Sequence, residues 1–164
     1  MAHSPRAGET VFAIEAGLGG GRLDPALLRL LHDASGASGS ELEQLERVEI
    51  PKLTVLTVRE GAVLVAFAAF AVSETTVTIE YLAVDASRRG VGLGRNLIGE
   101  LVKLHPNETM VAETDDDAVD FYRRLGFTVT PRGSDSRWPD RPRYRCVLPP
   151  AGQGAPPPAL TLPS

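Results

Sequence analysis

Residues 79–104 (IEYLAVDASRRGVGLGRNLIGELVKL) read as a strand, a glycine-rich turn and a helix. An apolar strand runs into a polar segment that starts at Asp85, and three glycines follow at alternate positions, Gly90, Gly92 and Gly94. Leucine and isoleucine then recur at helical spacing. This order constrains the fold strongly, because it predicts a strand that turns sharply into an amphipathic helix.

The glycine-rich turn, residues 85–94, is suited to bind an anion. The first N–H groups of a helix have no partner within the helix, and the helix dipole adds partial positive charge there. Glycine lacks the Cβ atom that would hold a ligand away from those groups. Arg88, Arg89 and Arg95 add full positive charges. We therefore expect a phosphate or pyrophosphate group as the ligand.

Three kinds of phosphate-binding turn can be compared with this one. The Walker A turn needs a Gly-Lys pair, and the chain contains none. The dinucleotide fingerprint needs G-x-G-x-x-G after a strand that opens a βαβ unit, whereas here the spacing is G-x-G-x-G in mid-chain. The third pattern, R-x-x-G-x-G, is met by residues 89–94.

Together with the preceding residues Leu82 to Asp85, this third pattern resembles the acetyl-CoA-binding segment of the GNAT N-acetyltransferase superfamily. A second segment, residues 115–129 (DDDAVDFYRRLGFTV), resembles the family's A-x-x-F-Y-x-x-x-G-F signature. The resemblance covers residues 52–148, and it implies an α/β (α+β) fold. That fold has a mixed central sheet, with helices on both faces, in the order β-α-α-β-β-β-α-β-α-β-β.

The resemblance also implies acetyl-CoA as co-substrate. It assigns the pyrophosphate to the backbone of the turn and the pantetheine amides to the strand before it, which splays from its neighbour in the family and offers free backbone groups. The expected cofactor-binding residues are Leu82, Ala83, Val84, Arg89, Gly90, Val91, Gly92, Leu93, Gly94 and Arg95. An ordinary tight turn with solvated arginines is the alternative reading, and Arg88 is expected to face solvent only.

Two side chains are expected to be catalytic. Tyr122 stands where the family places a tyrosine that donates a proton or a hydrogen bond to the departing thiol; simple packing beside Phe121 is the alternative. Glu80 lies within a predicted inner strand, where a carboxylate is costly. We expect it to deprotonate the amine, directly or through water. The alternatives are an edge glutamate facing water and a glutamate paired to an arginine. Glu113 and Asp115 are rival bases.

Asp115 departs from the family pattern, in which an Asn at this position often contacts the cofactor. A carboxylate cannot donate a hydrogen bond, which leaves a helix N-cap as the other role.

The sequence predicts one domain at residues 10–148 between a disordered N-terminus (1–9) and a disordered Pro-rich tail (149–164). Asp24 is expected to cap a first helix, and Ser40 with Glu43 a second through a capping box. Further helices are expected at 93–104 and 115–125, strands at 10–16, 52–59, 62–72, 76–84, 109–113, from 127 and at 143–148, a turn at 17–21 and a polar loop at 131–142.

Composition limits the partners. A net charge of −4 disfavours nucleic acid. Cys146 is the only cysteine, so neither an intramolecular disulfide nor a cysteine-based zinc site is expected, and no metal is predicted. No apolar run is long enough to span a membrane, and residues 1–8 lack the apolar core of a signal peptide. A cytoplasmic location is the default expectation.

The expected function is N-acetyl transfer from acetyl-CoA to a primary amine of a small molecule or protein, by direct attack. One alternative is a non-catalytic acyl-CoA-binding regulatory module, which would need neither Tyr122 nor Glu80. Another is a nucleotide-phosphate binder on an unrelated α/β fold. The acceptor amine stays open, since residues 23–48 and 131–142 carry no recognisable motif, and a homodimer stays open as well.

Overall fold

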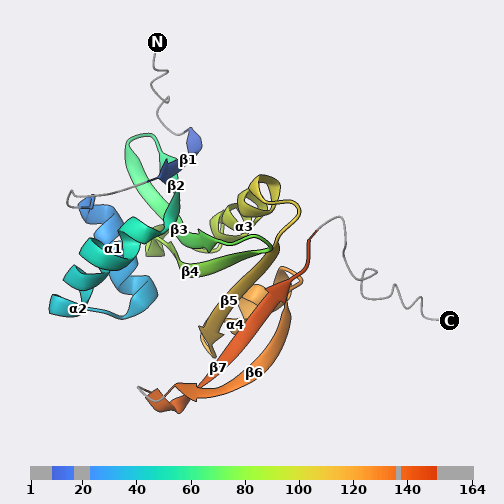
Figure 1. The fold of residues 1–164 in the computed structure, drawn as a ribbon. Coiled ribbons are helices and arrows are strands. Elements are labelled where there is room, and N and C mark those ends of the chain that lie inside the picture. The colour runs from blue at the N-terminus through green and yellow to red at the C-terminus, as the bar shows by residue number, and fades with distance from the viewer. Residues whose placement is uncertain (1–8, 17–22, 136–137, 151–164) are drawn as a thin grey trace. The chain divides into compact units, whose positions relative to one another are not determined.

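The computed structural model describes residues 9–16, 23–135 and 138–150 (Figure 1). Within these ranges seven strands form a mixed sheet in the order β1-β2-β3-β4-β5-β7-β6, and the element order along the chain is the predicted one. The expectations for the N-terminus at residues 1–8, for the turn at 17–21 and for the tail from 151 lie outside the described residues. The chain divides into two units, residues 1–71 with 79–99 and residues 72–78 with 100–164.

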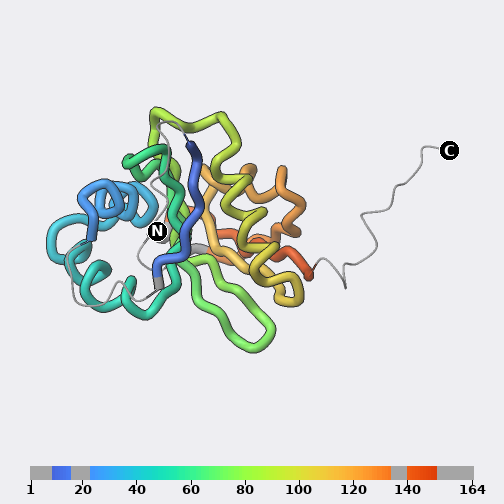
Figure 2. The backbone as a smooth tube through the Cα atoms, turned by 90° about the horizontal axis from the view of Figure 1, so that it is seen from above, coloured from blue at the N-terminus to red at the C-terminus, as the bar shows by residue number. Residues whose placement is uncertain are grey.

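The first unit is built on antiparallel strands that run side by side (Figure 2). β1 (Thr10–Ala16) pairs with β2 (Thr54–Glu60), and β2 pairs with β3 (Val63–Val72). β4 (Thr76–Val84) is the next neighbour of β3. The strand expected from residue 52 begins at Thr54, because residues 50–52 form a 3-10 turn instead.

Helix α1 (Pro25–Ser35) begins as predicted. The Asp24 side chain caps it by accepting a hydrogen bond from the Ala26 N–H at 2.8 Å, and proline occupies the first turn, where no N–H is needed. Gly36, at φ 71°, ends the helix in the left-handed conformation that glycine adopts readily.

Helix α2 (Gly39–Gln44) corrects one prediction. Its N-cap is Ser38, which makes no side-chain capping bond, so the capping box expected from Ser40 and Glu43 is wrong. Because the helix starts earlier than predicted, Ser40 lies inside it and no longer occupies the capping position. The helix continues through a π turn at Leu45–Glu49, and Glu46 accepts a hydrogen bond from the Leu23 N–H at 2.8 Å.

The core of the first unit forms where α1 packs on the sheet. Leucines of α1 interdigitate with side chains of β2, β3 and β4, which removes a continuous apolar surface from water. The buried cluster consists of Leu23, Leu27, Leu30, Leu31, Ile50, Val55, Leu64, Phe67, Ala69 and Ala83. β3 is buried from Leu64 to Phe70, as expected of a strand that is covered on both faces.

The second unit has an antiparallel set of its own. β7 (Trp138–Leu148) pairs with β5 (Thr109–Asp115) on one side and with β6 (Thr128–Asp135) on the other. Helix α4 (Val119–Arg124) packs on β6 and β7. Gly126 follows the helix at φ 91°, in the left-handed conformation that glycine adopts readily.

Two predictions for the second unit are wrong. The helix expected over residues 115–125 starts only at Val119, because Thr114 and Asp115 pair with β7 and still belong to β5. The polar loop expected over residues 131–142 is largely strand, since β6 extends to Asp135 and β7 begins at Trp138. Cross-strand pairing satisfies the backbone there, although the side chains are mostly polar.

Helix α3 (Leu93–Leu104) begins in the first unit and ends in the second. No helix in the described part of the chain is both long enough and apolar enough to cross a membrane.

Two glycine substitutions should change stability in opposite directions. Gly99 lies inside α3 with free space at its Cβ position, so Gly99→Ala should raise the free energy of unfolding by about 0.5–1 kcal/mol. Gly126 has φ 91°, so Gly126→Ala should lower the free energy of unfolding by about 1 kcal/mol through backbone strain. Urea denaturation measures both, and a change of the same sign in the two variants would contradict this account.

Candidate functional site

The glycine-rich turn joins the end of β4 to the start of α3. A short 3-10 turn (Ala86–Arg88) follows β4, and two glycines then take left-handed conformations, Gly90 at φ 82° and Gly92 at φ 89°. Residues with a Cβ rarely adopt such angles. The glycines at these two positions are therefore required by the path of the backbone.

Three backbone donors at the start of α3 lack a partner within the helix. The first helical hydrogen bond runs from the Asn96 N–H to the Gly92 carbonyl at 2.9 Å, so the N–H groups of the three residues 93–95 precede the helical ladder. A Cβ added at Gly90 or Gly92 would meet no atom within 4 Å. The turn thus combines donors, the positive end of a helix dipole and open space, which fits a phosphate group.

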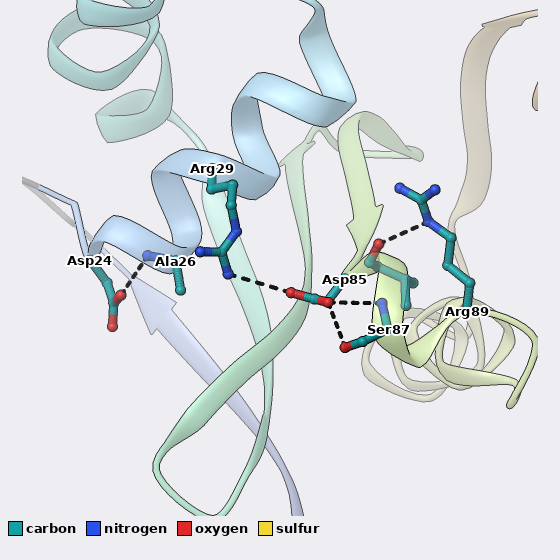
Figure 3. Close-up of polar contacts among 7 residues, drawn as sticks. Asp24, Ala26, Arg29, Asp85, Ser87 and Arg89 are labelled. Atoms are coloured by element: carbon teal, nitrogen blue, oxygen red, sulfur yellow. Dashed lines mark hydrogen bonds and ion pairs between the residues drawn. The ribbon is translucent and has the colours of Figure 1, made fainter.

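Asp85 holds the first part of the turn in place (Figure 3). Its Oδ1 accepts hydrogen bonds from the Ser87 N–H at 3.0 Å and the Ser87 hydroxyl at 2.7 Å, and its Oδ2 lies 3.4 Å from Arg29 of α1. These Ser87 bonds, with a smaller contribution from the Arg29 charge, hold the pKa of Asp85 below its ordinary value. The backbone N–H of Asp85 donates a hydrogen bond to the Val65 carbonyl of β3 at 2.8 Å.

Two of the three arginines are engaged within the protein. Arg88 forms an ion pair with Glu60 of β2, with Nε 2.9 Å from Oε1 and Nη2 in contact with the same oxygen, so the expectation that Arg88 only faces solvent is wrong. Arg89 donates from Nε to the Val84 carbonyl at 3.2 Å (Figure 3). Arg95 is exposed on the first turn of α3.

The strand before the turn has one buried and one less buried face. Val77, Ile79 and Ala83 are buried, whereas Leu82 and Val84 are half-buried. Glu80 lies on the second face and is exposed, so the burial cost expected for its carboxylate does not arise. Successive residues of a strand point to opposite faces, but the exposure of a face depends on what covers it.

Tyr122 occupies an aromatic cluster in the second unit. Its ring meets Phe121 and Phe127 edge-on, with centroids 5.0 and 5.2 Å away, and only 7% of the residue is exposed. Burial, with a smaller contribution from the Cys146 thiol, raises the pKa of Tyr122 above its ordinary range. The hydroxyl therefore keeps its proton at neutral pH, as a hydrogen-bond donor must.

The rival carboxylates of the second unit both have partners. Glu113 forms an ion pair with Arg132 of β6. Asp115 is not the N-cap of α4, because it ends β5 and Ala118 occupies the cap position. Its side chain instead accepts a hydrogen bond from the Asp117 N–H at 3.0 Å, in the turn before the helix.

Sequence reasoning missed two features near these carboxylates. Tyr144 of β7 donates from its hydroxyl to Asp116 at 2.5 Å. A hollow of about 190 Å³ lies nearby, lined by Asp115, Asp116, Asp117, Asp140, Arg141 and Pro142. No local sequence pattern predicts either feature, because both bring together residues that are distant in sequence. Among the described residues, no group of three or more potential metal ligands comes together.

Solved structures share this fold. A GNAT-family protein from Desulfovibrio desulfuricans is 21% identical over 86% of this chain and 99% of its own, with a TM-score of 0.64. A GNAT acetyltransferase from Elizabethkingia anophelis with acetyl-CoA bound is 14% identical over 85% of this chain and 97% of its own, with a TM-score of 0.63. The Escherichia coli ribosomal-protein-S18-alanine N-acetyltransferase is 21% identical over 85% of this chain and 94% of its own, with a TM-score of 0.60.

At these identities the structural likeness establishes the fold alone. No curated protein matches the chain. The family model described as the acetyltransferase (GNAT) family matches residues 25–127, which is more than half of the chain and includes both the glycine-rich turn and Tyr122. The chain therefore belongs to the GNAT acetyltransferase family.

Proposed function

We propose that this protein is an acetyl-CoA-dependent N-acetyltransferase that acts on a primary amine of a small molecule or a peptide. The observation that carries the proposal is the start of α3, where backbone donors and two left-handed glycines border open space. A family relative of the same fold binds acetyl-CoA. Another, by its name, acetylates the alanine of a ribosomal protein, which makes amines the first acceptors to test.

The glycine-rich turn would bind the pyrophosphate of the co-substrate through the N–H groups of residues 89–95, with Arg95 adding charge. Leu82, Ala83 and Val84 would pair with the pantetheine amides, as an added strand pairs with a sheet edge. A backbone N–H of the same strand would stabilise the oxyanion that forms when the amine adds to the thioester carbonyl.

The amine must be neutral to attack. For a lysine-type amine, with a pKa of about 10.4, the neutral form costs roughly 4–5 kcal/mol at pH 7, whereas for an α-amino group it costs only about 1 kcal/mol. Glu80 is proposed to take this proton, directly or through water, because its carboxylate is exposed. Glu113 is paired to Arg132, which makes it the weaker candidate.

Tyr122 is proposed to assist the leaving group. When the tetrahedral intermediate collapses, the C–S bond breaks and the sulfur departs with the electron pair. Burial raises the pKa of the Tyr122 phenol, and an ordinary thiol titrates near about 8.5. Complete proton transfer to the thiolate is then unfavourable, so the main contribution expected from Tyr122 is a hydrogen bond to the departing sulfur.

The first test of the co-substrate site is Gly92→Val. The new side chain would enter the open space beside the turn and strain the backbone at φ 89°, so the Kd for acetyl-CoA in calorimetric titration should rise by about tenfold or more. Gly39→Val is the matched control, because Gly39 also has a positive φ and open space but lies at α2. Equal affinity in the two variants would refute the assignment.

Tyr122→Phe tests the leaving-group role. The variant keeps the aromatic packing and loses the hydroxyl, so kcat should fall by about 10- to 100-fold while KM for acetyl-CoA stays within about twofold. Release of free thiol in the presence of an amine panel measures both constants. Full kcat in this variant would remove Tyr122 from the mechanism.

The pH dependence follows from the direction of the Tyr122 pKa. Below the amine pKa the neutral amine becomes more abundant as the pH rises, so kcat/KM should increase from pH 7 towards pH 9.5. An ordinary tyrosine, with a pKa of 10.0, would begin to ionise near the top of this range, but a raised pKa delays that loss. A decline of kcat below pH 9.5 would contradict a buried, protonated Tyr122.

Binding and turnover together separate the two classes of function. Saturable acetyl-CoA binding with thiol release for any amine supports the enzyme. Binding without thiol release across peptides, polyamines and aminoglycosides would instead favour an acyl-CoA-binding regulatory module.

A further inference from the structure

We propose that Tyr144 is a positioning residue, which holds the short helix that carries Tyr122 by contacting both the segment before the helix and its last turn. The inference rests on the proposed function, in which Tyr122 assists the leaving group. Every contact involved lies within the second unit.

Helix α4 needs such support from outside. It has only six residues, and its N-cap Ala118 offers no side-chain capping bond. Isolated helices of this length do not form in water, because too few hydrogen bonds offset the cost of nucleation. Tertiary contacts must therefore determine where α4 lies.

Tyr144 provides these contacts at both ends of the segment. Its hydroxyl donates to Oδ1 of Asp116 at 2.5 Å, a short bond to a carboxylate. Its ring lies under the Arg123 guanidinium, with Cζ 5.9 Å from the ring centroid. Arg123 is in turn fixed to Asp120 one turn earlier, with Nη1 2.9 Å from Oδ1.

The sheet restrains the backbone of Tyr144. In β7 it pairs with Thr114 of β5 on one side and with Pro131 of β6 on the other, so its backbone is held from both directions. The hydrogen bond to Asp116 also raises the pKa of Tyr144, so the hydroxyl keeps the proton that it donates.

Arg123 directly follows Tyr122 in α4, so a displaced last turn would also displace the Tyr122 ring. That ring has edge contacts with Phe121 and Phe127 on either side. Loss of the contacts with Tyr144 should therefore misplace the Tyr122 hydroxyl without removing it.

The test is Tyr144→Phe in the full-length protein, with two readouts. Amide hydrogen exchange should become about tenfold faster over residues 116–124, since the Asp116 bond is lost. With an accepted amine, kcat should fall by about fivefold while KM for acetyl-CoA is unchanged. In a Tyr122→Phe background, the further change Tyr144→Phe should not lower kcat any further.

The controls separate position from general damage. Asp116→Ala should match Tyr144→Phe, whereas Asp116→Asn keeps an acceptor and should restore most of kcat. Arg123→Gln should also accelerate exchange, whereas Arg124→Gln, its exposed neighbour outside these contacts, should not.

Each outcome decides a different point. Unchanged exchange in Tyr144→Phe overturns the positioning role, and so does an equal kcat loss in the Tyr122→Phe background. Faster exchange in a protein that acetylates no amine upholds the restraint on α4 and refutes the proposed function instead.

Discussion

The backbone between β4 and α3 is the constraint on which the candidate site depends. Two glycines at positive φ bring the chain from the end of β4 to the first turn of a helix, where the N–H groups of residues 93–95 precede the helical ladder. Asp85 fixes the entry to the turn through Ser87 and Val65. The donors are therefore positioned before any ligand arrives, which lowers the entropy that binding must overcome.

Much of the fold could be predicted because its signals are local. Asp24 before Pro25 marks the start of a helix within a few residues, and the structure confirms that prediction. The errors arise where contacts with residues distant in sequence determine the secondary structure. Asp115 resembles a helix start by composition but pairs with Arg143 across the sheet, and the polar residues after Pro131 form a strand only because β7 lies beside them.

In the candidate site, too, the features set by local sequence could be predicted and those set by distant residues could not. Its backbone part follows from the glycine spacing, which encodes conformation directly. The side-chain part does not, because the partner of Arg88 is Glu60 and the partner of Tyr144 is Asp116, each 28 positions away. The alternation of a strand places Glu80 on the same face as Leu82, but the exposure of Glu80 depends on what covers that face.

The pairing of Arg88 with Glu60 and of Arg89 with the Val84 carbonyl bears on how the protein would respond to ionic strength. Mobile ions screen the attraction between exposed charged side chains over a Debye length of about 8 Å at physiological salt. Donors that touch a ligand directly, such as backbone N–H groups, are much less affected. With two arginines already engaged and Arg95 adding charge, retention of a polyanion at the glycine-rich turn would rely mainly on peptide dipoles. It should therefore vary less with salt than capture by a cluster of free cations.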